Sequence, residues 1–442
     1  MLLMRESLMS NFNDFALKNE LVRNLTELGH IRPTPIQSLA IPLILGGHDL
    51  LGIAQTGTGK TGAFSLPIIQ NLLVKTKLVA KGTPRVLILI PTRELCLQVT
   101  AVFEAYAKNL ALRTCAIFGG VDQAEQVRRL REGVDIVVAT PGRLLDLMEQ
   151  KQLRLSEVEF FVLDEADRML DMGFIDEIKQ ISTLLPVARQ TMLFSATMPV
   201  EIENLAAKVL RNPKKVQVAP AATVADKIQQ RFILCSRDNK FQLLKKIIKE
   251  EKIERVLVFT KTKTTADFVV EYLAQNRTAS KTFHSDMKQP ERERALGLFK
   301  DGSIKVLVAT DMAARGLDID GISHVINFDL PLNPETYVHR IGRTARSGKE
   351  GIAISFCDDS EKGILSKIQQ VIQLKIKTET FEGKSERLNL KATGLRKVTA
   401  PTPGKSQEKT AYLDHSKRQA PLKEGEKRVH PGFRNNTKKK RK

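Results

Sequence analysis

The sequence contains no run of 18 or more apolar residues, so no segment of it predicts a membrane-spanning helix. The first ten residues are interrupted early by Arg5 and Glu6 and do not have the pattern of a signal peptide. We therefore expect a cytoplasmic protein that does not associate with membranes. Methionines at positions 1, 4 and 9 leave the start codon open.

Cysteine is scarce. The four residues of this type are Cys96, Cys115, Cys235 and Cys357. They lie far apart in the sequence and form no CxxC pair, so their spacing indicates neither a zinc site nor a disulfide framework. This usage of cysteine fits the reducing cytoplasm.

Positive charge, by contrast, is abundant. The formal net charge is +20, which favours a polyanionic partner. From Thr380 to Lys442 there are 18 Lys and Arg against 6 Asp and Glu, a net charge of +12, which leaves +8 for the preceding residues. Most of the excess therefore lies at one end of the chain, and composition alone does not establish a basic binding groove.

Short β-branched runs alternate with longer amphipathic stretches up to about residue 370. Continuous apolar runs predict strands that are buried on both faces of a parallel sheet, and their alternation with helices predicts βαβ units. The predicted strands are Val86–Ile90, Asp135–Val138, Phe160–Leu163, Met192–Phe194, Val256–Phe259, Lys305–Val308, Val325–Phe328 and Ile352–Phe356.

The strand series is interrupted about midway, near Asn212-Pro213 and through residues 219–222. At 442 residues the chain exceeds one ordinary core, so we expect two α/β domains, residues 1–214 and 226–372, joined by a linker at 215–225. Residues 373–442 are rich in Lys, Pro, Gly, Ser and Gln and predict a disordered basic tail. In open parallel sheets, ligands bind outside the carboxyl ends of the strands, where most of the polar motifs of this chain fall.

A Gly-rich turn followed by Lys-Thr occupies residues 54–61 (AQTGTGKT). This pattern predicts a phosphate-binding loop in which backbone N–H groups face the phosphates, Lys60 reaches the β- and γ-phosphates and Thr61 holds Mg²⁺. ATP and Mg²⁺ are thus the expected cofactors. The loop residues expected around the nucleotide are Ala54, Gln55, Thr56, Gly57, Thr58, Gly59, Lys60 and Thr61. The alternative is a Gly-rich turn that binds nothing.

An acidic tetrad, residues 164–167 (DEAD), directly follows the predicted strand Phe160–Leu163. Asp164 at the end of a buried strand is the expected second anchor for Mg²⁺. Glu165 is in position to orient or deprotonate the attacking water. Taken alone, four such residues are equally typical of a solvated turn.

Upstream of the loop, the segment from Gly29 ends at Gln37, whose amide can pair with the edge of adenine. Phe12 is able to stack on the same base. From physical chemistry alone, Phe12 as a core aromatic is an equal alternative.

Together these motifs resemble those of the DEAD-box RNA helicases, and the resemblance covers residues 10–360. It is carried by further motifs in the same order: Pro91–Leu95, Gly119-Gly120, Thr140–Arg143, Ser195–Thr197, Val258–Thr260, Ala309–Asp318 and His339–Arg346. The resemblance implies two tandem RecA-like domains and an ATP-dependent, RNA-stimulated enzyme.

The resemblance also implies roles for single residues. Phe12, Arg32 and Gln37 would recognise adenine, and Ser195 and Thr197 would couple the ATP site to domain closure. The second domain would reach the nucleotide through Gly316, Asp318 and two arginine fingers, Arg343 and Arg346. Without the resemblance, these arginines would be read as a surface salt-bridge cluster.

RNA contacts are implied at several strand ends. They are Pro91, Thr92, Arg93, Gly119, Gly120, Thr140, Pro141, Gly142 and Arg143 in the first domain and Thr260, Gln289, Arg292, Thr310 and Asp311 in the second. Exposed N–H groups at helix starts and turns bind phosphate without reading bases, which predicts little sequence specificity. Bent single strands cannot stay paired, so we expect local, non-processive remodelling of RNA duplexes and RNA–protein complexes.

The second domain has no GKT sequence of its own, so one ATP would be shared by two half-sites. ATP would then favour closure of the domains, and closure would complete the RNA groove. His30, Ser285 and Ala345 depart from the usual motifs without removing a charge. Residues 344–348 and 351–357 resemble the bacterial RhlE-like branch.

Two alternatives remain: a DNA helicase of the same superfamily, and a non-enzymatic RNA scaffold. The basic tail predicts either a nonspecific RNA tether or a merely solvated segment. Partners from ribosome assembly or RNA decay are compatible with such a tail, and we expect a monomeric core.

Overall fold

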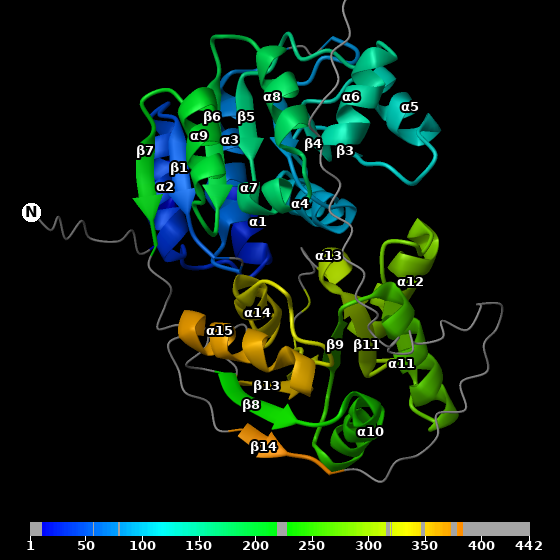
Figure 1. Cartoon of the computed structure of the whole chain (residues 1–442). Helices are drawn as coiled ribbons and strands as arrows, with labels where there is room; N and C mark the ends of the chain where they lie inside the picture. The colour runs from blue at the N-terminus through cyan, green and yellow to red at the C-terminus, as the bar shows by residue number, and fades with distance from the viewer. Residues whose placement is uncertain are drawn as a thin grey trace, which may run out of the picture. The chain divides into compact units, whose positions relative to one another are not determined.

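The computed structural model describes residues 11–55, 57–77, 80–218, 228–314, 319, 321–345, 350–372 and 378–382 (Figure 1). Within these residues the chain forms two seven-stranded sheets, and every strand pairing within them is parallel. Helices connect successive strands. The predicted α/β fold with two parallel sheets is confirmed.

The first domain holds the first sheet. In spatial order its strands are β3 (Thr114–Ile117), β4 (Ile136–Ala139), β2 (Val86–Leu89), β5 (Phe160–Leu163), β6 (Gln190–Ser195), β1 (Leu50–Ile53) and β7 (Lys214–Gln217). Its helices are the 3-10 helix η1 (Phe12–Phe15) and the α-helices α1 (Asn19–Glu27), α2 (Pro35–Leu45), α3 (Lys60–Val74), α4 (Arg93–Tyr106), α5 (Ala124–Glu132), α6 (Pro141–Glu149), α7 (Ala166–Asp171), α8 (Ile175–Thr183) and α9 (Val200–Val209).

The second domain holds the second sheet. In spatial order its strands are β10 (Ser280–Phe283), β11 (Val306–Thr310), β9 (Val256–Thr260), β12 (His324–Asn327), β13 (Gly351–Cys357), β8 (Ile228–Leu234) and β14 (Thr378–Thr380). Its helices are η3 (Arg237–Asn239), α10 (Lys240–Glu250), α11 (Lys263–Gln275), α12 (Gln289–Lys300), α13 (Asp311–Ala314), α14 (Pro334–Ile341), η4 (Asp359–Glu361) and α15 (Lys362–Ile372). None of the helices that the structure describes is long and apolar enough to cross a membrane.

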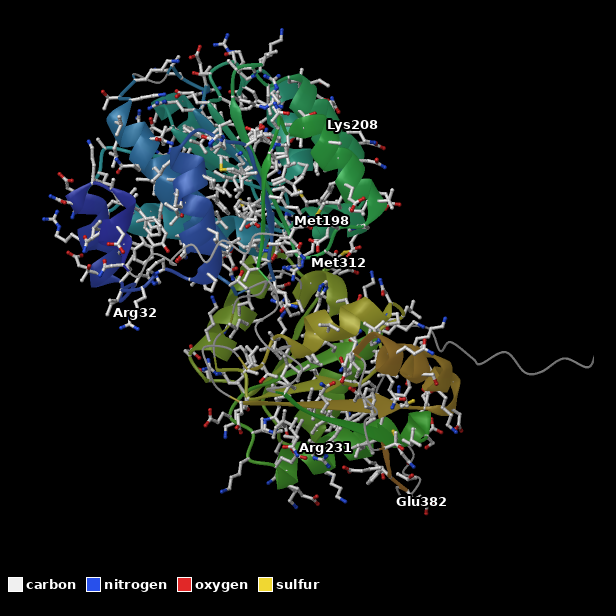
Figure 2. The ribbon with its side chains drawn as sticks, turned by 90° about the vertical axis from the view of Figure 1, so that its left-hand side faces the viewer. Arg32, Met198, Lys208, Arg231, Met312 and Glu382 are labelled. Carbon is white, nitrogen blue, oxygen red and sulfur yellow. The ribbon has the colours of Figure 1, made fainter. Side chains whose placement is uncertain are left out.

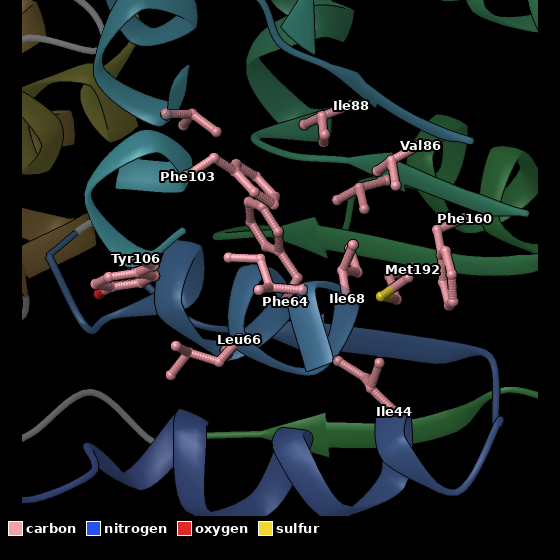
Figure 3. Close-up of a cluster of buried hydrophobic side chains, with 14 of the residues drawn as sticks. Ile44, Phe64, Leu66, Ile68, Val86, Ile88, Phe103, Tyr106, Phe160 and Met192 are labelled. Atoms are coloured by element: carbon pink, nitrogen blue, oxygen red, sulfur yellow. The ribbon is translucent and has the colours of Figure 1, made fainter. Parts of the chain in front are cut away.

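The central strands are apolar at every position because both faces of each sheet are covered. In β2, Val86 and Ile88 join the core on one face, whereas Leu87 and Leu89 join the core on the other. This alternation is the ordinary consequence of strand geometry. Figure 3 shows the first of these cores, in which the ring of Phe64 on α3 lies 6.2 Å from that of Phe103 on α4.

Several helices begin within a few residues of the strand that precedes them, and local signals mark their starts. Thr92 Oγ1 accepts a hydrogen bond from Leu95 N at 3.3 Å and caps α4, which follows β2. Pro141 occupies the first turn of α6, which follows β4. Such short connections keep the motifs at the carboxyl ends of the strands.

Both sheets extend past the predicted domain boundaries. The first continues through β7 to Gln217, beyond residue 214, and the second includes β14, beyond residue 372. The three residues of β14 are polar and exposed, so apolar patterning did not reveal this strand. The remainder of the predicted tail, 383–442, and linker residues 219–225 lie outside the described residues.

Side-chain contacts attach β14 to the second domain. The guanidinium of Arg231 on β8 donates to both carboxylate oxygens of Glu379, each at 3.1 Å. Phe381 packs against the adjoining core, where Lys246 lies 5.6 Å from its ring centroid. Figure 2 labels Arg231 and Glu382 on this domain.

These contacts predict a measurable contribution of β14 to stability. A chain that ends at Ile372 loses the strand pairing and the Arg231–Glu379 ion pair, and we expect its second domain to lose about 1–3 kcal/mol of unfolding free energy. Urea unfolding compares it with a chain that ends at Glu382, which keeps β14. Equal urea midpoints for the two chains would show that β14 contributes nothing.

Candidate active site

The order of strands in the first sheet divides the predicted site residues into two groups. The phosphate-binding loop, the acidic tetrad and Ser195–Thr197 fall at the ends of β1, β5 and β6, which are neighbours in the sheet. The predicted RNA motifs follow β2, β3 and β4, which are also neighbours. Sequence order alone does not show this division, because the three strands of the second group separate β1 from β5 and β6 along the chain.

The predicted phosphate-binding loop connects β1 to α3. Gly57 and Gly59 have φ of +83° and +93°, a backbone conformation that a side chain would strain. Lys60 begins α3 and is 6% exposed, and its ammonium has no hydrogen-bond partner among the described residues. A buried cation without a hydrogen bond is costly unless a ligand supplies one, so these residues fit a bound phosphate chain.

Gln37 connects the predicted adenine segment to this loop. Its Oε1 accepts from Thr34 N at 2.9 Å, and its Nε2 donates to Gly59 O at 3.1 Å. A Cβ placed on Gly62 would lie 2.5 Å from Nε2, so only glycine leaves room for the amide.

The other two members of the predicted adenine segment differ from each other in exposure. Arg32 is exposed. Phe12 is 3% exposed in the core, with its ring 6.0 Å from that of Phe15. This placement fits the alternative role of Phe12 as a core aromatic, and its contact with adenine stays a prediction.

The first two residues of the acidic tetrad are buried at the end of β5. Burial raises the pKa of the Asp164 carboxyl to about 6, while the nearby Lys60 ammonium acts in the opposite direction. Glu165 has φ of +56°, and its Oε2 accepts from Arg168 Nη1 at 2.6 Å, with both side chains 5% exposed. The sequence did not single out Arg168, which fixes the orientation of the Glu165 carboxylate.

No group of three or more His, Cys, Asp or Glu in the described part of the chain could hold a metal ion. Mg²⁺ is commonly bound by one or two protein oxygens together with phosphate oxygens and water. Thr61 and Asp164, which follow β1 and β5 on the two sides of β6, therefore fit Mg²⁺ only in combination with a bound nucleotide.

Asp167, which sequence reasoning also missed, joins the tetrad to Ser195 and Thr197. Its Oδ2 accepts from Thr197 N at 2.9 Å and from Thr197 Oγ1 at 3.0 Å, and its own N–H donates to Ser195 Oγ at 3.2 Å. Burial opposes ionisation of Asp167, but Lys60 and Thr197 outweigh it and lower the pKa of the carboxyl. Its place in the tetrad was the available signal.

The predicted RNA residues of the first domain lie together at the ends of β2, β3 and β4. Gly120 has φ of +82°, and a Cβ there would overlap the guanidinium of Arg93. Arg143 donates to Val121 O at 3.4 Å, next to these glycines in the chain. The structure thus brings Pro91–Arg93, Gly119-Gly120 and Thr140–Arg143 together at the carboxyl ends of three neighbouring strands.

The second domain shows the same grouping. Thr260 ends β9, Thr310 ends β11, and Gln289 begins α12 shortly after β10, so all three follow neighbouring strands. Arg292 lies over the ring of Phe283 at 4.5 Å and donates to His284 O at 3.3 Å.

Asp311 has a partner that the sequence did not single out. Arg340 on α14 donates to its two carboxylate oxygens at 2.5 and 2.7 Å, and also to Asn327 Oδ1 at 3.0 Å. Arg343 follows on the same segment, is 5% exposed, and donates to His339 O at 3.3 Å. Arg340 thereby links a predicted RNA residue to the segment that carries a predicted arginine finger. Thr56, Gly316, Asp318 and Arg346 lie outside the described residues.

Comparison with known proteins places these motifs in context. A family model described as "DEAD/DEAH box helicase" matches residues 34–205, and one described as "Helicase conserved C-terminal domain" matches residues 239–348. The chain is 42% identical over 362 residues to the ATP-dependent RNA helicase CshA of Listeria monocytogenes, covering 82% of this chain and 69% of that one. It is 41% identical over 372 residues to the DEAD-box ATP-dependent RNA helicase RhpA of Helicobacter pylori, covering 84% and 74%.

Among solved structures, the chain is similar to S. cerevisiae Dbp5 bound to RNA and ADP BeF3, with a TM-score of 0.75 and 32% identity over 84% of this chain and 96% of that one. It is also similar to Mss116p bound to ssRNA and AMP-PNP, with a TM-score of 0.75 and 29% identity over 84% and 79%. The likeness to Dbp5 confirms the predicted pair of tandem RecA-like domains.

The close approach of Gln37 to the loop yields a test. We expect Gly62→Ala to displace the amide from Gly59 and to weaken binding of a fluorescent ATP analogue by roughly fivefold, the factor for a hydrogen bond worth about 1 kcal/mol. Gly297→Ala is the matched control, since a Cβ at Gly297 in α12 meets nothing within 4 Å. Unchanged affinity in Gly62→Ala would show that the Gln37 contact does not shape the loop.

Proposed function

We propose, for a chain that belongs to the DEAD-box family of ATP-dependent RNA helicases, that ATP hydrolysis at one group of strand ends in the first sheet is coupled to RNA remodelling at the neighbouring group. The observation that carries this proposal is the strand order. In the first domain the ATP motifs follow β1, β5 and β6, whereas the RNA motifs follow β2, β3 and β4. The second domain groups its RNA residues in the same way after β9, β10 and β11.

The first domain binds and activates the nucleotide. The Lys60 ammonium, which has no hydrogen-bond partner among the described residues, binds the β- and γ-phosphates. Thr61 and Asp164 would hold Mg²⁺, which would supply positive charge to stabilise the charge that develops on the phosphates. Glu165, oriented by Arg168, accepts a proton from the attacking water or orients it. Gln37, Arg32 and Phe12 recognise the adenine base.

The second domain supplies Arg343 and Arg346 to the γ-phosphate when the domains close, together with Gly316 and Asp318. Such arginines stabilise the transition state, so hydrolysis is slow until closure. We call the predicted RNA residues of each domain, which lie at the carboxyl ends of neighbouring strands, its RNA edge. RNA that binds the RNA edges of both domains favours the same closed state as ATP, so each ligand tightens the binding of the other. RNA-bound neighbours support RNA as the partner.

Two polar contacts fit this coupling. Within the ATP group, Asp167 joins the tetrad that follows β5 to Ser195, the last residue of β6, and to Thr197 just after that strand. Arg340 joins Asp311 at the RNA edge to the segment of Arg343. A shift at either end of these contacts is transmitted because the groups are buried and hydrogen-bonded.

The proposal includes several finer points. The nucleotide-binding domain spans residues 1–214, the linker 215–225 and the second helicase domain 226–372, with the sheets themselves reaching Gln217 and Thr380. Unwinding is local and non-processive, with little sequence specificity. We also propose a monomeric, cytoplasmic enzyme of the RhlE-like branch, with partners in ribosome assembly or RNA decay. Four buried free thiols fit a reducing compartment.

The test of this function measures ATP turnover in the native chain and in Glu165→Gln with RNA and with DNA of the same sequence. We expect RNA to stimulate the native chain more than DNA does. Glu165→Gln should lower kcat by roughly 10²–10⁴-fold with nucleotide affinity retained, because the side chain keeps its shape and loses its basicity.

Glu201→Gln, an exposed carboxylate on α9, is the matched control and should behave as the native chain. Equal turnover in Glu165→Gln and the native chain would support a non-enzymatic scaffold. Equal stimulation by DNA would replace the substrate class.

A second prediction concerns the basic C-terminal residues, which carry most of the excess positive charge. A chain that ends at Glu382 keeps both sheets, and we expect its half-maximal RNA concentration for ATP turnover to rise about tenfold at low salt. Its maximal turnover should change little, because the site residues are intact. A large loss of turnover at saturating RNA would contradict the tether.

A further inference from the structure

The two sheets have the same strand order, so each strand of the first domain has a counterpart in the second. On this basis β1 corresponds to β8, β5 to β12 and β6 to β13. The correspondence extends to single hydrogen bonds. Ala54 N, just after β1, donates to Ser195 O at 3.0 Å, and Cys235 N, just after β8, donates to Cys357 O at 3.0 Å. The segment after β8 therefore occupies the place that the phosphate-binding loop occupies in the first domain.

A lysine stands at the same point of both segments. Residues 54–59 lead from β1 to α3, which begins at Lys60, and residues 235–239 lead from β8 to α10, which begins at Lys240. Both side chains are buried, with exposed fractions of 6% for Lys60 and 1% for Lys240. Burial of a lysine at the start of a helix is unfavourable on two counts, desolvation and the helix dipole, so each ammonium requires anionic partners.

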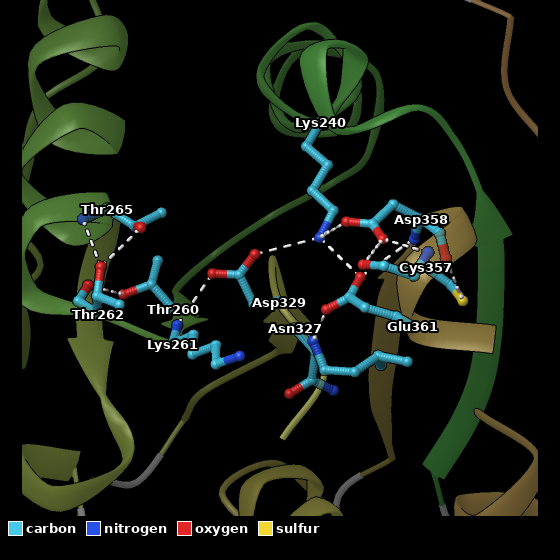
Figure 4. A network of polar contacts seen from close by, with 12 residues as sticks. Lys240, Thr260, Lys261, Thr262, Thr265, Asn327, Asp329, Cys357, Asp358 and Glu361 are labelled. Atoms are coloured by element: carbon cyan, nitrogen blue, oxygen red, sulfur yellow. Dashed lines mark hydrogen bonds and ion pairs between the residues drawn. The ribbon is translucent and has the colours of Figure 1, made fainter. Parts of the chain in front are cut away.

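The two lysines differ in what surrounds the ammonium. Lys60 has no hydrogen-bond partner among the described residues. Lys240 Nζ lies 2.8 Å from Glu361 Oε2, 3.1 Å from Asp329 Oδ1 and 3.3 Å from Asp358 Oδ2, as Figure 4 shows. Three carboxylates thus lie within 3.3 Å of the Lys240 ammonium, whereas Asp164 and Asp167 act on the Lys60 ammonium only electrostatically and accept no hydrogen bond from it.

These carboxylates come from the corresponding strand ends. Asp329 is the second residue after β12, whereas Asp164 is the first after β5, and Asp358 directly follows β13, the counterpart of β6. The carboxylates around Lys240 also accept backbone hydrogen bonds. Lys261 N donates to Asp329 Oδ2 at 2.9 Å, and Leu330 N donates to Glu361 Oε1 at 2.9 Å. Burial alone would lower the pKa of Lys240, but Asp329 and Glu361 outweigh it and hold the pKa above its ordinary value.

The cluster also reaches the RNA edge of the second domain. Asp329 bonds the N–H of Lys261, the residue after Thr260. The backbone carbonyl of Asp329 accepts a hydrogen bond from Arg340 at 2.6 Å, and Arg340 also donates to Asp311, next to Thr310. The segments of Thr260 and of Thr310-Asp311 are thereby both linked to Asp329 by hydrogen bonds.

We propose that Lys240 is a positioning residue for the RNA edge of the second domain. With Asp329, Asp358 and Glu361 it forms a counterpart of the phosphate site in which carboxylates of the chain take the place of phosphate. This cluster holds the RNA edge in place without nucleotide. This proposal rests on the proposed RNA role of Thr260, Thr310 and Asp311. It assigns different behaviour to the two domains: the RNA edge of the first responds to a ligand at Lys60, and that of the second is fixed by its own side chains.

The test replaces Lys240 in the full chain. Lys240→Met leaves three neighbouring carboxylates without their cation, so Asp329 should shift and loosen both RNA segments. We expect the KM for RNA in the ATPase reaction to rise on the order of tenfold. The affinity for fluorescent ADP should stay near the native value, because the nucleotide binds the first domain, and kcat at saturating RNA should do so because bound RNA restores the arrangement of both segments. This division between KM and kcat separates positioning from general loss of structure.

Two controls accompany this variant. Lys240→Arg keeps the charge and should retain a KM for RNA close to native. Lys249→Met makes the same chemical change at an exposed position of α10 and should have no effect. If Lys240→Met does not fold, Asp329→Asn takes its place, since it removes the charge at constant volume, and it should raise the KM for RNA in the same direction.

Two outcomes overturn the proposal. One is a native KM for RNA in folded Lys240→Met, or in Asp329→Asn where Lys240→Met does not fold, which would leave the cluster a purely structural one. The other is a change in ADP affinity as large as the change in KM for RNA. Thr260→Ala distinguishes failure of the proposed RNA edge from failure of the positioning role of Lys240. If it also has a native KM for RNA, the proposed RNA edge fails; if it raises KM while the cluster variants do not, only the role of Lys240 fails.

Discussion

Parallel pairing of the strands is the constraint on which the rest of this structure depends. Because all pairings within each sheet are parallel, the carboxyl ends of the strands meet at one edge, and residues far apart in the sequence meet there too. The strand order then decides which residues become neighbours. In the first domain it separates the residues that follow β1, β5 and β6 from those that follow β2, β3 and β4. In the second domain it separates the residues that follow β8, β12 and β13 from those that follow β9, β10 and β11.

The free-energy cost of burying a charge explains the different surroundings of the two buried lysines near the carboxyl ends of the strands. A buried ammonium needs anions, and the two domains meet this need differently at Lys60 and Lys240. The Lys60 ammonium has no hydrogen-bond partner among the described residues, while three carboxylates of the chain surround that of Lys240. In our proposal, a single architecture thereby yields one domain that responds to a nucleotide and one that serves as a preformed support. The burial and hydrogen bonding of Asp167 and Arg340 extend the same principle from the strand ends to the neighbouring motifs.

Apolar periodicity predicted most of the fold, since strands such as Val86–Leu89 are buried on both faces and cannot contain polar residues. It failed at the sheet margins. β14 is polar because it lies at an exposed edge, and β7 is exposed at three of its four positions, so neither carries an apolar run. The site residues with a distinctive spacing, Lys60 and Asp164 among them, were predicted for a similar reason: their chemistry requires those residue types after a strand.

Residue types and spacing were therefore sufficient to predict the class of fold, which the structure confirms, and the roles of residues 54–61 and 164–167, which stay predictions. Tertiary structure alone decided which polar residues support them. Arg168, Arg340 and Lys240 are ordinary in the sequence, because a guanidinium or ammonium is usually solvated, and only burial beside carboxylates gives them a role. Phe12 shows the converse: its local sequence allowed either stacking on a base or a place in the core. Only tertiary packing decided that its side chain is buried, and its contact with adenine stays a prediction.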